Sequence, residues 1–312
     1  MSRAVVFPGQ GSQAVGMGHA LAEAFSIARD VFGEVDEALK QKLSRLMWDG
    51  PESELVLTEN AQPALMAVSL AVVRVLEQQG NWKIGEKAAM VAGHSLGEYS
   101  ALAAAGTFSL ADTARLLKTR GLAMQKAVPV GQGAMAALLG VEIDQAREIA
   151  REAAEKDVCE AANDNAPGQV VVSGTKVAVE RAMAIFAARG FKRSILLPVS
   201  APFHCALMQP AADVMADALS HVAMQAPVVP LIANVTASPT RDPEEIRKLL
   251  VAQVTGTVRW RESVLAMKAA GVDNLVEMGA GKVLSGLTKR IDKDISAVSL
   301  QTPADIEAFL KA

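Results

Sequence analysis

A short aliphatic run that ends in a glycine-flanked serine constrains the fold of this chain more than any other stretch. Residues 87–93 (KAAMVAG) read as a buried strand, and residues 96–106 (LGEYSALAAAG) have a helical pattern. Between them, Gly93, Ser95 and Gly97 form the pattern G-x-S-x-G. In that context the turn strains the backbone of the serine and projects its hydroxyl toward the positive end of the helix. The stretch therefore predicts a strand–turn–helix unit that presents Ser95 as a nucleophile.

The same pattern also has a purely structural interpretation, in which Ser95 only caps the helix that follows. The five-residue pattern alone leaves the two interpretations balanced, and the strand before it with the helix after it favours the nucleophile. If an oxyanion forms at Ser95, the N–H of Leu96 is the natural first donor, because it belongs to the free end of the helix.

Strands and helices alternate along most of the chain, which predicts an α/β fold. Residues 4–7 and 87–93 read as buried strands, and a helix is expected to begin near Gln62. Hydrophobic residues make up 51% of the chain and aromatic residues only 4%, a composition that suits helices packed on a parallel sheet. A further strand is expected over residues 228–235 (VVPLIANV).

Residues 133–199 have a different order, β-α-β-β-α-β, which is the ferredoxin-like pattern. A turn-rich link at residues 164–168 (DNAPG) is expected to join the two middle strands. We therefore predict an α/β-hydrolase-like large domain with a parallel sheet, formed by residues 1–127 and 200–312. An inserted ferredoxin-like α+β small domain is expected over residues 128–199.

A nucleophilic serine needs a base, and the chain has four histidines. His94 adjoins Ser95, so the sharp turn is expected to aim it elsewhere. His19 and His221 lie among polar neighbours in helical stretches and read as surface residues. His204 lies in a loop directly after a strand, where such folds place functional side chains. Elimination therefore favours His204 as the base.

The group that orients the imidazole of His204 stays open on these grounds. The aspartates between Ser95 and His204 read as helix-cap or turn residues; they are Asp112, Asp144, Asp157 and Asp164. A backbone carbonyl or an amide could take the place of an acid.

Arg120 is the clue to the substrate. Leu116, Leu117 and Met124 lie on the same face of its helix, so its guanidinium is placed on an apolar stripe. A buried guanidinium needs a partner, because uncompensated burial of a charge costs several kcal/mol. The partner is either an internal Asp or Glu, or a carboxylate that arrives with the substrate and is held by two hydrogen bonds.

Charge and cysteine content limit the remaining function classes. The net charge is −3 and the isoelectric point is about 5.9, which points to neither a nucleic acid nor a membrane surface as partner. Cys159 and Cys205 are expected to be free thiols in a reducing compartment. The first residues lack the apolar core of a signal peptide, and the most apolar stretch is interrupted by Arg74. A cytoplasmic protein is expected.

Several motifs together resemble the malonyl-CoA:acyl-carrier-protein transacylases, the acyltransferases that load fatty-acid synthesis. They are distributed over nearly the whole length, in the order of the family: VVFPGQGSQAVGMG, ENAQPALMA, GHSLGEYSAL, TRGLAMQ, NDNAPGQVVVSG, VSAPFHC and EMGAGKVLSGLTKR. The fold that this resemblance implies, an α/β-hydrolase-like domain carrying a ferredoxin-like one, agrees with the pattern of strands and helices. Ala166 stands in NDNAPG where the family often has serine.

The resemblance implies a role for each matching residue of the reaction centre. Ser95 would be the acylated nucleophile and His204 its general base. Gln10 would supply the second oxyanion N–H beside that of Leu96. Gln253 would orient His204 through its backbone carbonyl, which would explain the missing acid.

The resemblance also implies how the acyl group and its carrier are held. Arg120 would bind the free carboxylate of the malonyl group, and Gln62 would line the pocket near it. Asn163 would lie in the channel for the pantetheine arm. Phe203 resembles the bulky residue of malonyl-selective members, whose ring limits branched acyl groups.

The reaction implied is transfer of a malonyl group from malonyl-CoA to the phosphopantetheine thiol of holo acyl carrier protein, through an acyl-serine. Metal and cofactor are not required, because CoA and the pantetheine arm are substrates. A monomer is expected, with the acidic carrier received by basic residues at Lys192 and Arg193 or at Lys289 and Arg290. The alternatives are a serine thioesterase or esterase, an acyltransferase of polyketide assembly, and a catalytically silent scaffold.

Overall fold

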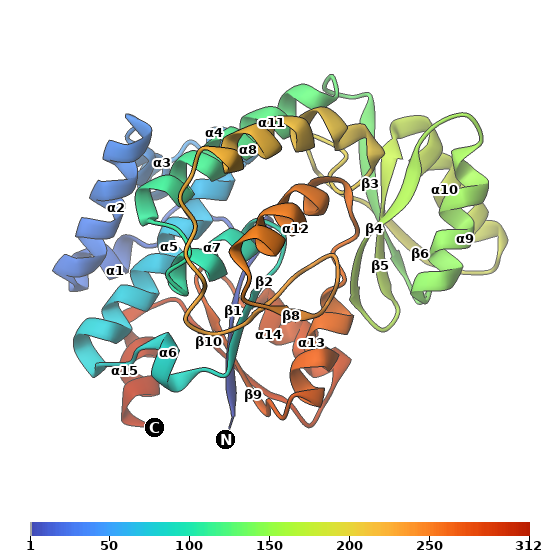
Figure 1. The fold of residues 1–312 in the computed structure, drawn as a ribbon. Helices are drawn as coiled ribbons and strands as arrows, with labels where there is room; N and C mark the ends of the chain where they lie inside the picture. The colour runs from blue at the N-terminus through green and yellow to red at the C-terminus, as the bar shows by residue number, and fades with distance from the viewer. Residues whose placement is uncertain (1) are drawn as a thin grey trace.

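The computed structural model describes residues 2–312, and a six-stranded sheet with the order β10-β9-β1-β2-β7-β8 forms its centre (Figure 1). Neighbouring strands are parallel except β8, which is antiparallel to β7 at one edge. The strands are β1 (Arg3–Phe7), β2 (Met90–Gly93), β7 (Leu231–Ile232), β8 (Pro239–Thr240), β9 (Asn274–Met278) and β10 (Ser296–Leu300).

Alternation along β1 shows why this sheet is apolar on both faces. Val5 and Phe7 point into the larger core cluster, whereas Ala4 and Val6 point into a second cluster on the opposite face. Successive side chains of a strand point to opposite faces, so a strand covered on both sides is a continuous aliphatic run. The α/β class predicted from these runs is confirmed.

Helices cover both faces of the large sheet, and the longest is α5. Those that follow or precede its strands are α1 (His19–Ala24), α2 (Ser26–Leu39), α3 (Leu43–Asp49), α4 (Glu52–Leu55), α5 (Thr58–Gly80), α6 (Ile84–Lys87), α7 (Leu96–Ala104), α8 (Leu110–Ala127), the 3-10 helix η1 (Ala206–Met208), α11 (Gln209–Ser220), α12 (Pro243–Thr255), α13 (Trp260–Ala269), α14 (Val283–Ile291) and α15 (Pro303–Lys311). Within residues 2–312, none of the helices is both long and apolar enough to cross a bilayer.

A second sheet, with the order β4-β5-β3-β6, lies beside the first (Figure 1). Its strands are antiparallel to their neighbours. They and the two helices that pack on them are β3 (Gly133–Leu139), α9 (Ile143–Ala154), β4 (Cys159–Ala166), β5 (Gln169–Thr175), α10 (Lys176–Ala188) and β6 (Arg193–Leu196). This order is the ferredoxin-like arrangement predicted for residues 133–199. The domain boundaries at residues 128 and 200 remain predictions.

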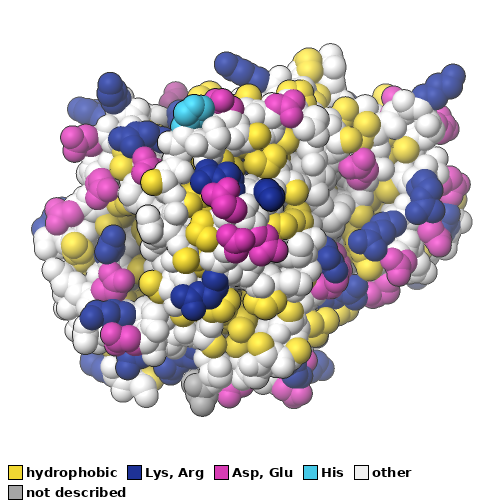
Figure 2. Space-filling model, in the orientation of Figure 1, with side chains coloured by type: hydrophobic (Ala, Val, Ile, Leu, Met, Phe, Trp, Pro, Cys, Tyr) yellow, Lys and Arg dark blue, Asp and Glu magenta, His cyan; other side chains and the backbone are white. Residues whose placement is uncertain are grey.

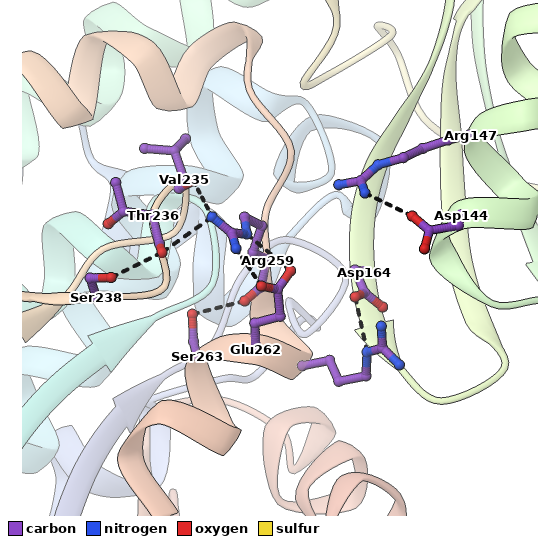
Figure 3. Close-up of polar contacts among 10 residues, drawn as sticks. Asp144, Arg147, Asp164, Val235, Thr236, Ser238, Arg259, Glu262 and Ser263 are labelled. Carbon is purple, nitrogen blue, oxygen red and sulfur yellow. Dashed lines mark hydrogen bonds and ion pairs between the residues drawn. The ribbon is translucent and has the colours of Figure 1, made fainter. Parts of the chain in front are cut away.

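Strand β4 also bonds to the segment between α12 and α13 of the large domain. The Val258 N–H donates to the Ala162 carbonyl (2.8 Å), and the Asp164 N–H donates to the Val258 carbonyl (2.9 Å). Arg261 forms ion pairs with Asp164 (3.0 Å) and Glu142 (2.9 Å). Figure 3 shows Asp164 facing the segment that carries Arg259 and Glu262. The segment after α12 is therefore held to the small sheet by backbone and side-chain contacts.

Four expectations about local structure are corrected. Helix α5 begins at Thr58 rather than near Gln62, so Pro63 lies inside it as its sixth residue and removes one bond of the helix. Strand β4 extends to Ala166, so the link is only the turn at residues 167–168. The strand expected over residues 228–235 is limited to β7, because Pro230 has no N–H for the ladder.

The fourth correction concerns Asp164, which is not a turn residue. It lies on β4, its side chain is buried, and its carboxylate pairs with Arg261. Its carboxylate is thus engaged with Arg261, and the Nδ1 of His204 is bonded to the Gln253 carbonyl instead, so Asp164 is not the acid of a triad.

Candidate active site

The turn between β2 and α7 holds Ser95 in a conformation that few residues adopt. Its φ is 54° and its ψ is −110°, outside the regions open to an ordinary L-residue. The glycines on either side are needed for steric reasons. A Cβ on Gly93 would lie 1.9 Å from the Gly97 carbonyl oxygen, and a Cβ on Gly97 would lie 2.3 Å from the Phe7 carbonyl oxygen. The predicted strand–turn–helix unit is therefore present, with Ser95 at its tip.

Asn234, which sequence reasoning missed, holds this turn from both sides. Its Oδ1 accepts from the Ser95 N–H (2.7 Å), and its Nδ2 donates to the Gly93 carbonyl (2.7 Å). The side chain is fully buried at the end of β7. Because both bonds are made to the backbone, they stabilise the strained turn itself. The only signal in the sequence is an asparagine directly after an aliphatic strand.

His204 lies next to Ser95, as predicted. Its Nε2 is 2.8 Å from the Ser95 Oγ, and its Nδ1 is 2.9 Å from the Gln253 carbonyl oxygen. A carbonyl can only accept, so Nδ1 carries the proton and Nε2 is the free base. Burial, reinforced by the charge of Arg120, lowers the pKa of His204 to about 3, so the imidazole is neutral near pH 7.

Arg120 is buried, 1% exposed, and its guanidinium lies against the Ser95 hydroxyl. Its Nη1 donates to Gln62 Oε1 (2.8 Å), and its Nη2 donates to Gln253 Oε1 (2.7 Å) and to Ser95 Oγ (3.1 Å). Among the described residues no carboxylate lies within ion-pair distance of it. Amide oxygens thus hold the guanidinium in place while its charge remains available to a ligand.

A cavity of about 400 Å³ opens in front of Ser95, between the two sheets. The large domain contributes the serine, His204, Arg120 and the loop after β1, while β3 and β4 contribute Met135 and Asn163. Every predicted site residue except Gln253 borders this cavity: Gln10, Gln62, Ser95, Leu96, Arg120, Asn163, Phe203 and His204. Gln253 lies behind the wall, where it contacts both His204 and Arg120.

His94 is turned away from the Ser95 hydroxyl but still borders the cavity. Its Nε2 bonds to Asn165 Oδ1 (2.8 Å) on β4, and its ring lies 5.8 Å from that of Trp260. Burial lowers the pKa of His94. His94 therefore connects the turn to the small sheet. His19 and His221 are exposed, as predicted.

Glu98, in the first turn of α7, is a second residue that sequence reasoning missed. It is 1% exposed, and its Oε2 accepts from Gln253 Nε2 (2.7 Å) and from the Asn234 N–H (3.2 Å). Burial raises the pKa of Glu98 to about 7, against the opposing effects of these bonds and of Arg120. The signal in the sequence is an acid among small and apolar neighbours, in LGEYSALAA.

Serine, imidazole and oriented carbonyl together define a class of protein, the enzymes that work through a covalent acyl-serine. The model of the acyl transferase domain matches residues 4–299, and the chain belongs to this acyl transferase family.

Three similar proteins are of one kind. The malonyl CoA-acyl carrier protein transacylase of Escherichia coli K12 is 48% identical over 308 residues, which cover 99% of this chain and 98% of the relative. The crystal structure of an acyl-carrier-protein S-malonyltransferase from Bartonella henselae is 58% identical, with a TM-score of 0.97, and covers 100% and 99% of the two chains. A malonyl-transacylase solved in complex with a type II PKS acyl-carrier protein is 42% identical, with a TM-score of 0.96 and coverage of 100% and 99%.

Proposed function

We propose that Ser95 carries the malonyl group in a two-step exchange whose overall reaction is the transfer from malonyl-CoA to acyl carrier protein in fatty-acid synthesis. One observation carries this proposal. The Ser95 Oγ lies between the His204 Nε2 (2.8 Å) and the Arg120 Nη2 (3.1 Å), so a base and a cation that has no carboxylate in direct contact meet at the nucleophile. A three-carbon diacid thioester presents a carbonyl for attack by the serine that the base activates. It also presents a carboxylate for the cation to bind.

In the first step, His204 Nε2 takes the proton of Ser95 Oγ as that oxygen attacks the malonyl carbonyl carbon. The oxyanion that forms is stabilised by the N–H groups of Leu96 and Gln10. When it collapses, the carbon–sulfur bond breaks and the CoA sulfur receives the proton from His204. The pantetheine thiol of the carrier then gives its proton to His204 and attacks the carbonyl carbon of the acyl-serine. The bond to Ser95 Oγ breaks, Ser95 Oγ takes the proton back from His204, and the malonyl group leaves on the pantetheine sulfur.

Arg120 selects the acyl group in this scheme. Its Nη atoms face the place where a carboxylate two bonds from the reacting carbon would lie, and a guanidinium binds a carboxylate through two parallel bonds. Gln62 holds Nη1 from the opposite side. Phe203 borders the cavity next to His204, where its ring would hinder a branched acyl chain.

The remaining cavity accommodates the thioester arm. Asn163 on β4 borders it and offers an amide to the polar pantetheine chain, while Met135 and residues 197–199 make its apolar wall. The apolar wall restricts water near the acyl-serine, which favours transfer over hydrolysis. This distinguishes a transferase from the thioesterase or esterase alternative.

The carrier is received by local basic residues rather than by a field over the whole surface. On the face shown in Figure 2, Lys and Arg side chains are mixed with Asp and Glu side chains. Lys192 and Arg193 at β6, and Lys289 and Arg290 at the end of α14, are exposed and can pair with an acidic carrier. The carrier belongs to fatty-acid synthesis; a polyketide carrier is the second candidate, since one similar structure holds a type II PKS carrier.

We also infer that the protein works as a monomer in the cytoplasm. One chain supplies every group of the site described above. Cys159 and Cys205 are buried and form no disulfide, which is typical of proteins in a reducing compartment.

Replacement of Arg120 by Ala tests the proposal. It removes a charge-assisted, two-bond contact, so kcat/KM for malonyl-CoA should fall about 100-fold, which corresponds to roughly 3 kcal/mol. Acetyl-CoA has no carboxylate and should lose little. Equal losses for both thioesters would assign Arg120 a structural role instead.

A transfer assay separates the enzyme from an esterase. With malonyl-CoA and holo acyl carrier protein, transfer should greatly exceed release of free malonate. Rapid hydrolysis that the carrier does not change would favour the esterase. A protein that never acquires the malonyl mass increment at Ser95 would be a scaffold.

A further inference from the structure

Glu98 lies beneath the nucleophile with one of its two oxygens unpartnered. Its Oε2 accepts both available donors, Gln253 Nε2 and the Asn234 N–H. Its Oε1 is buried and has no hydrogen-bond partner within residues 2–312. A buried carboxylate oxygen without a donor is costly when charged, and the cost falls when the group is protonated.

Glu98 reaches the substrate pocket through the Gln253 amide. Gln253 Nε2 donates to Glu98 Oε2 (2.7 Å) and to the Ser95 carbonyl (2.9 Å), while its Oε1 accepts from Arg120 Nη2 (2.7 Å). Two acceptors on one side and a guanidinium on the other fix which end of the amide faces Arg120. If the amide were flipped, the Gln253 NH2 group would face the N–H groups of Arg120, and donor would oppose donor. The carboxylate therefore helps to hold Arg120 in the direction of Ser95.

The charges around Glu98 balance before a substrate binds. Arg120 on α8 is the cation that faces it, and Tyr99 on α7 is the other ionisable group, with its pKa raised to about 12 by burial. The end of β7 contributes the neutral Asn234 and α12 the neutral Gln253. His204, behind Arg120, is neutral because its pKa is lowered to about 3. One buried anion thus accompanies one buried cation.

A malonyl group brings a second anion to the same cation. Two carboxylates that share one positive charge in a site of low dielectric disfavour each other's ionisation. The substrate carboxylate makes direct bonds to Arg120, whereas Glu98 is linked to Arg120 only through the Gln253 amide. Glu98 is therefore the group that becomes protonated.

Resting on the function proposed above, we propose that Glu98 is a positioning residue that holds Gln253 and Arg120 in the free enzyme and takes up one proton when the malonyl carboxylate binds. The proton comes from solvent, and no bond of the substrate is changed. Acetyl-CoA, which adds no second anion, should bind without this uptake.

The free enzyme is poised for such an uptake near neutral pH. Burial raises the pKa of Glu98 to about 7, so most of the group is charged at pH 8 and largely protonated at pH 6. Malonyl-CoA binding should then take up close to one proton at pH 8 and much less at pH 6. Affinity for malonyl-CoA should fall by up to about tenfold per pH unit above pH 7, because the proton needed for binding becomes scarcer.

Calorimetric titration of the full chain with Ser95→Ala tests this without turnover. Binding of malonyl-CoA and acetyl-CoA is measured at pH 6 and pH 8 in two buffers that differ in ionisation enthalpy, which reports the protons exchanged. The two ligands carry the same phosphates, so their difference isolates the acyl carboxylate. Equal proton exchange for both ligands would overturn the proposal and leave the acyltransferase function standing. Failure of malonyl-CoA to bind, together with failure to acylate the unmodified Ser95, would overturn both.

Glu98→Gln in the same background keeps the shape and the acceptor oxygen but removes the charge. Its malonyl-CoA affinity should become independent of pH between 6 and 8, and the proton uptake should vanish. Glu277→Gln is the matched control, because Glu277 is an equally buried acid on β9 that accepts bonds only from α14 and β10. The Glu277→Gln variant should still take up a proton when malonyl-CoA binds. If Glu98→Gln does not fold, the comparison of the two ligands on the parent chain still decides.

Glu98→Ala with Ser95 intact tests the positioning role. Release of Gln253 and Arg120 should lower the preference for malonyl-CoA over acetyl-CoA by about tenfold, as expected for a misplaced binding group. An equal loss for both thioesters would show that Glu98 only supports the fold.

Discussion

Two strand-to-helix junctions of the large sheet, β2–α7 and β9–α14, differ in how the free N–H groups at the start of the helix are bonded. At both, a helix begins with N–H groups that have no partner in the preceding turn of helix. At β9–α14, the buried Glu277 accepts from the Leu284 N–H (3.0 Å) and the Ser285 N–H (2.8 Å). At β2–α7, the Gly97 N–H bonds to the His94 carbonyl, and within residues 2–312 the Leu96 N–H makes no hydrogen bond.

The difference shows how a functional junction departs from a structural one. The α14 junction has four residues between strand and helix, so Glu277 can fold back and cap the helix. The α7 junction has only His94 and Ser95 between Gly93 and Leu96, which strains Ser95 and leaves an N–H directed at the cavity. The buried acid of α7, Glu98, points away from the helix start and toward Gln253. The groups left free at the α7 junction are those that a reaction can use.

The largest difference between the junctions should appear when each serine is replaced. Ser95→Ala should abolish acyl-enzyme formation, because the attacking oxygen is lost. Ser285→Ala removes a hydroxyl that bonds to Glu277 and should cost about 1–2 kcal/mol of unfolding free energy with little change in rate. Intact-mass analysis with malonyl-CoA and a urea titration of each variant measure the two effects. A malonyl adduct on the Ser95 variant would assign the nucleophile elsewhere.

Loss of Asn234 should come next. Asn234→Ala leaves the Ser95 N–H and the Gly93 carbonyl without partners, so the turn should relax and kcat should fall by about 10- to 100-fold. The control change is Asn274→Ala at the start of β9, the end of the strand away from α14, which removes a bond to Ser296 (2.8 Å) and should leave kcat within about twofold. Steady-state transfer assays compare the pair. Similar rates for both variants would mean that the strained turn needs no such support.

Acid should destabilise the α7 region through His204. Its pKa is about 3 in the folded chain, whereas an unfolded chain binds a proton below about 6.5. The unfolded state therefore binds more protons as pH falls from 6.5 toward 3, and stability decreases in that window by at most about 1.4 kcal/mol per pH unit. His204→Gln should flatten this dependence. Urea titrations at pH 7, 6 and 5 measure it, and parallel slopes for parent and variant would contradict the assignment.

The smallest effect is expected for glycine replacement in the structural junction. Gly286 lies inside α14, and nothing beyond the backbone of its own helix lies within 4 Å of the position that a Cβ would take. Gly286→Ala should therefore stabilise the chain by about 0.5–1 kcal/mol. Gly97→Ala, in α7, should instead be strongly destabilising because of the Phe7 carbonyl. Thermal unfolding of the two variants should shift in opposite directions, and a shift of the same sign would show that the α7 turn tolerates expansion.

Much of the site was predictable from sequence because several of its residues lie in recognisable local sequence patterns. The strand before Ser95, the two glycines and the helix after it fix a strained turn by sterics alone. Arg120 falls on an apolar stripe, so its burial follows from helical periodicity. Elimination left His204, since His19 and His221 have polar neighbours and are exposed.

Asn234, Glu98 and the Gln253 side chain could not be placed in the same way. Each is a common polar residue in an ordinary local context, and each acquires its contacts from segments more than 130 residues away in the chain. The register of β7 beside β2 brings Asn234 to the turn, and the packing of α12 brings Gln253 between Arg120 and Glu98. Sequence therefore determined the place of Ser95, its strained turn and the burial of Arg120, because those depend on backbone sterics and periodicity. Only the tertiary structure decided which amides and acids surround them, because hydrogen bonds between distant segments depend on how the elements pack.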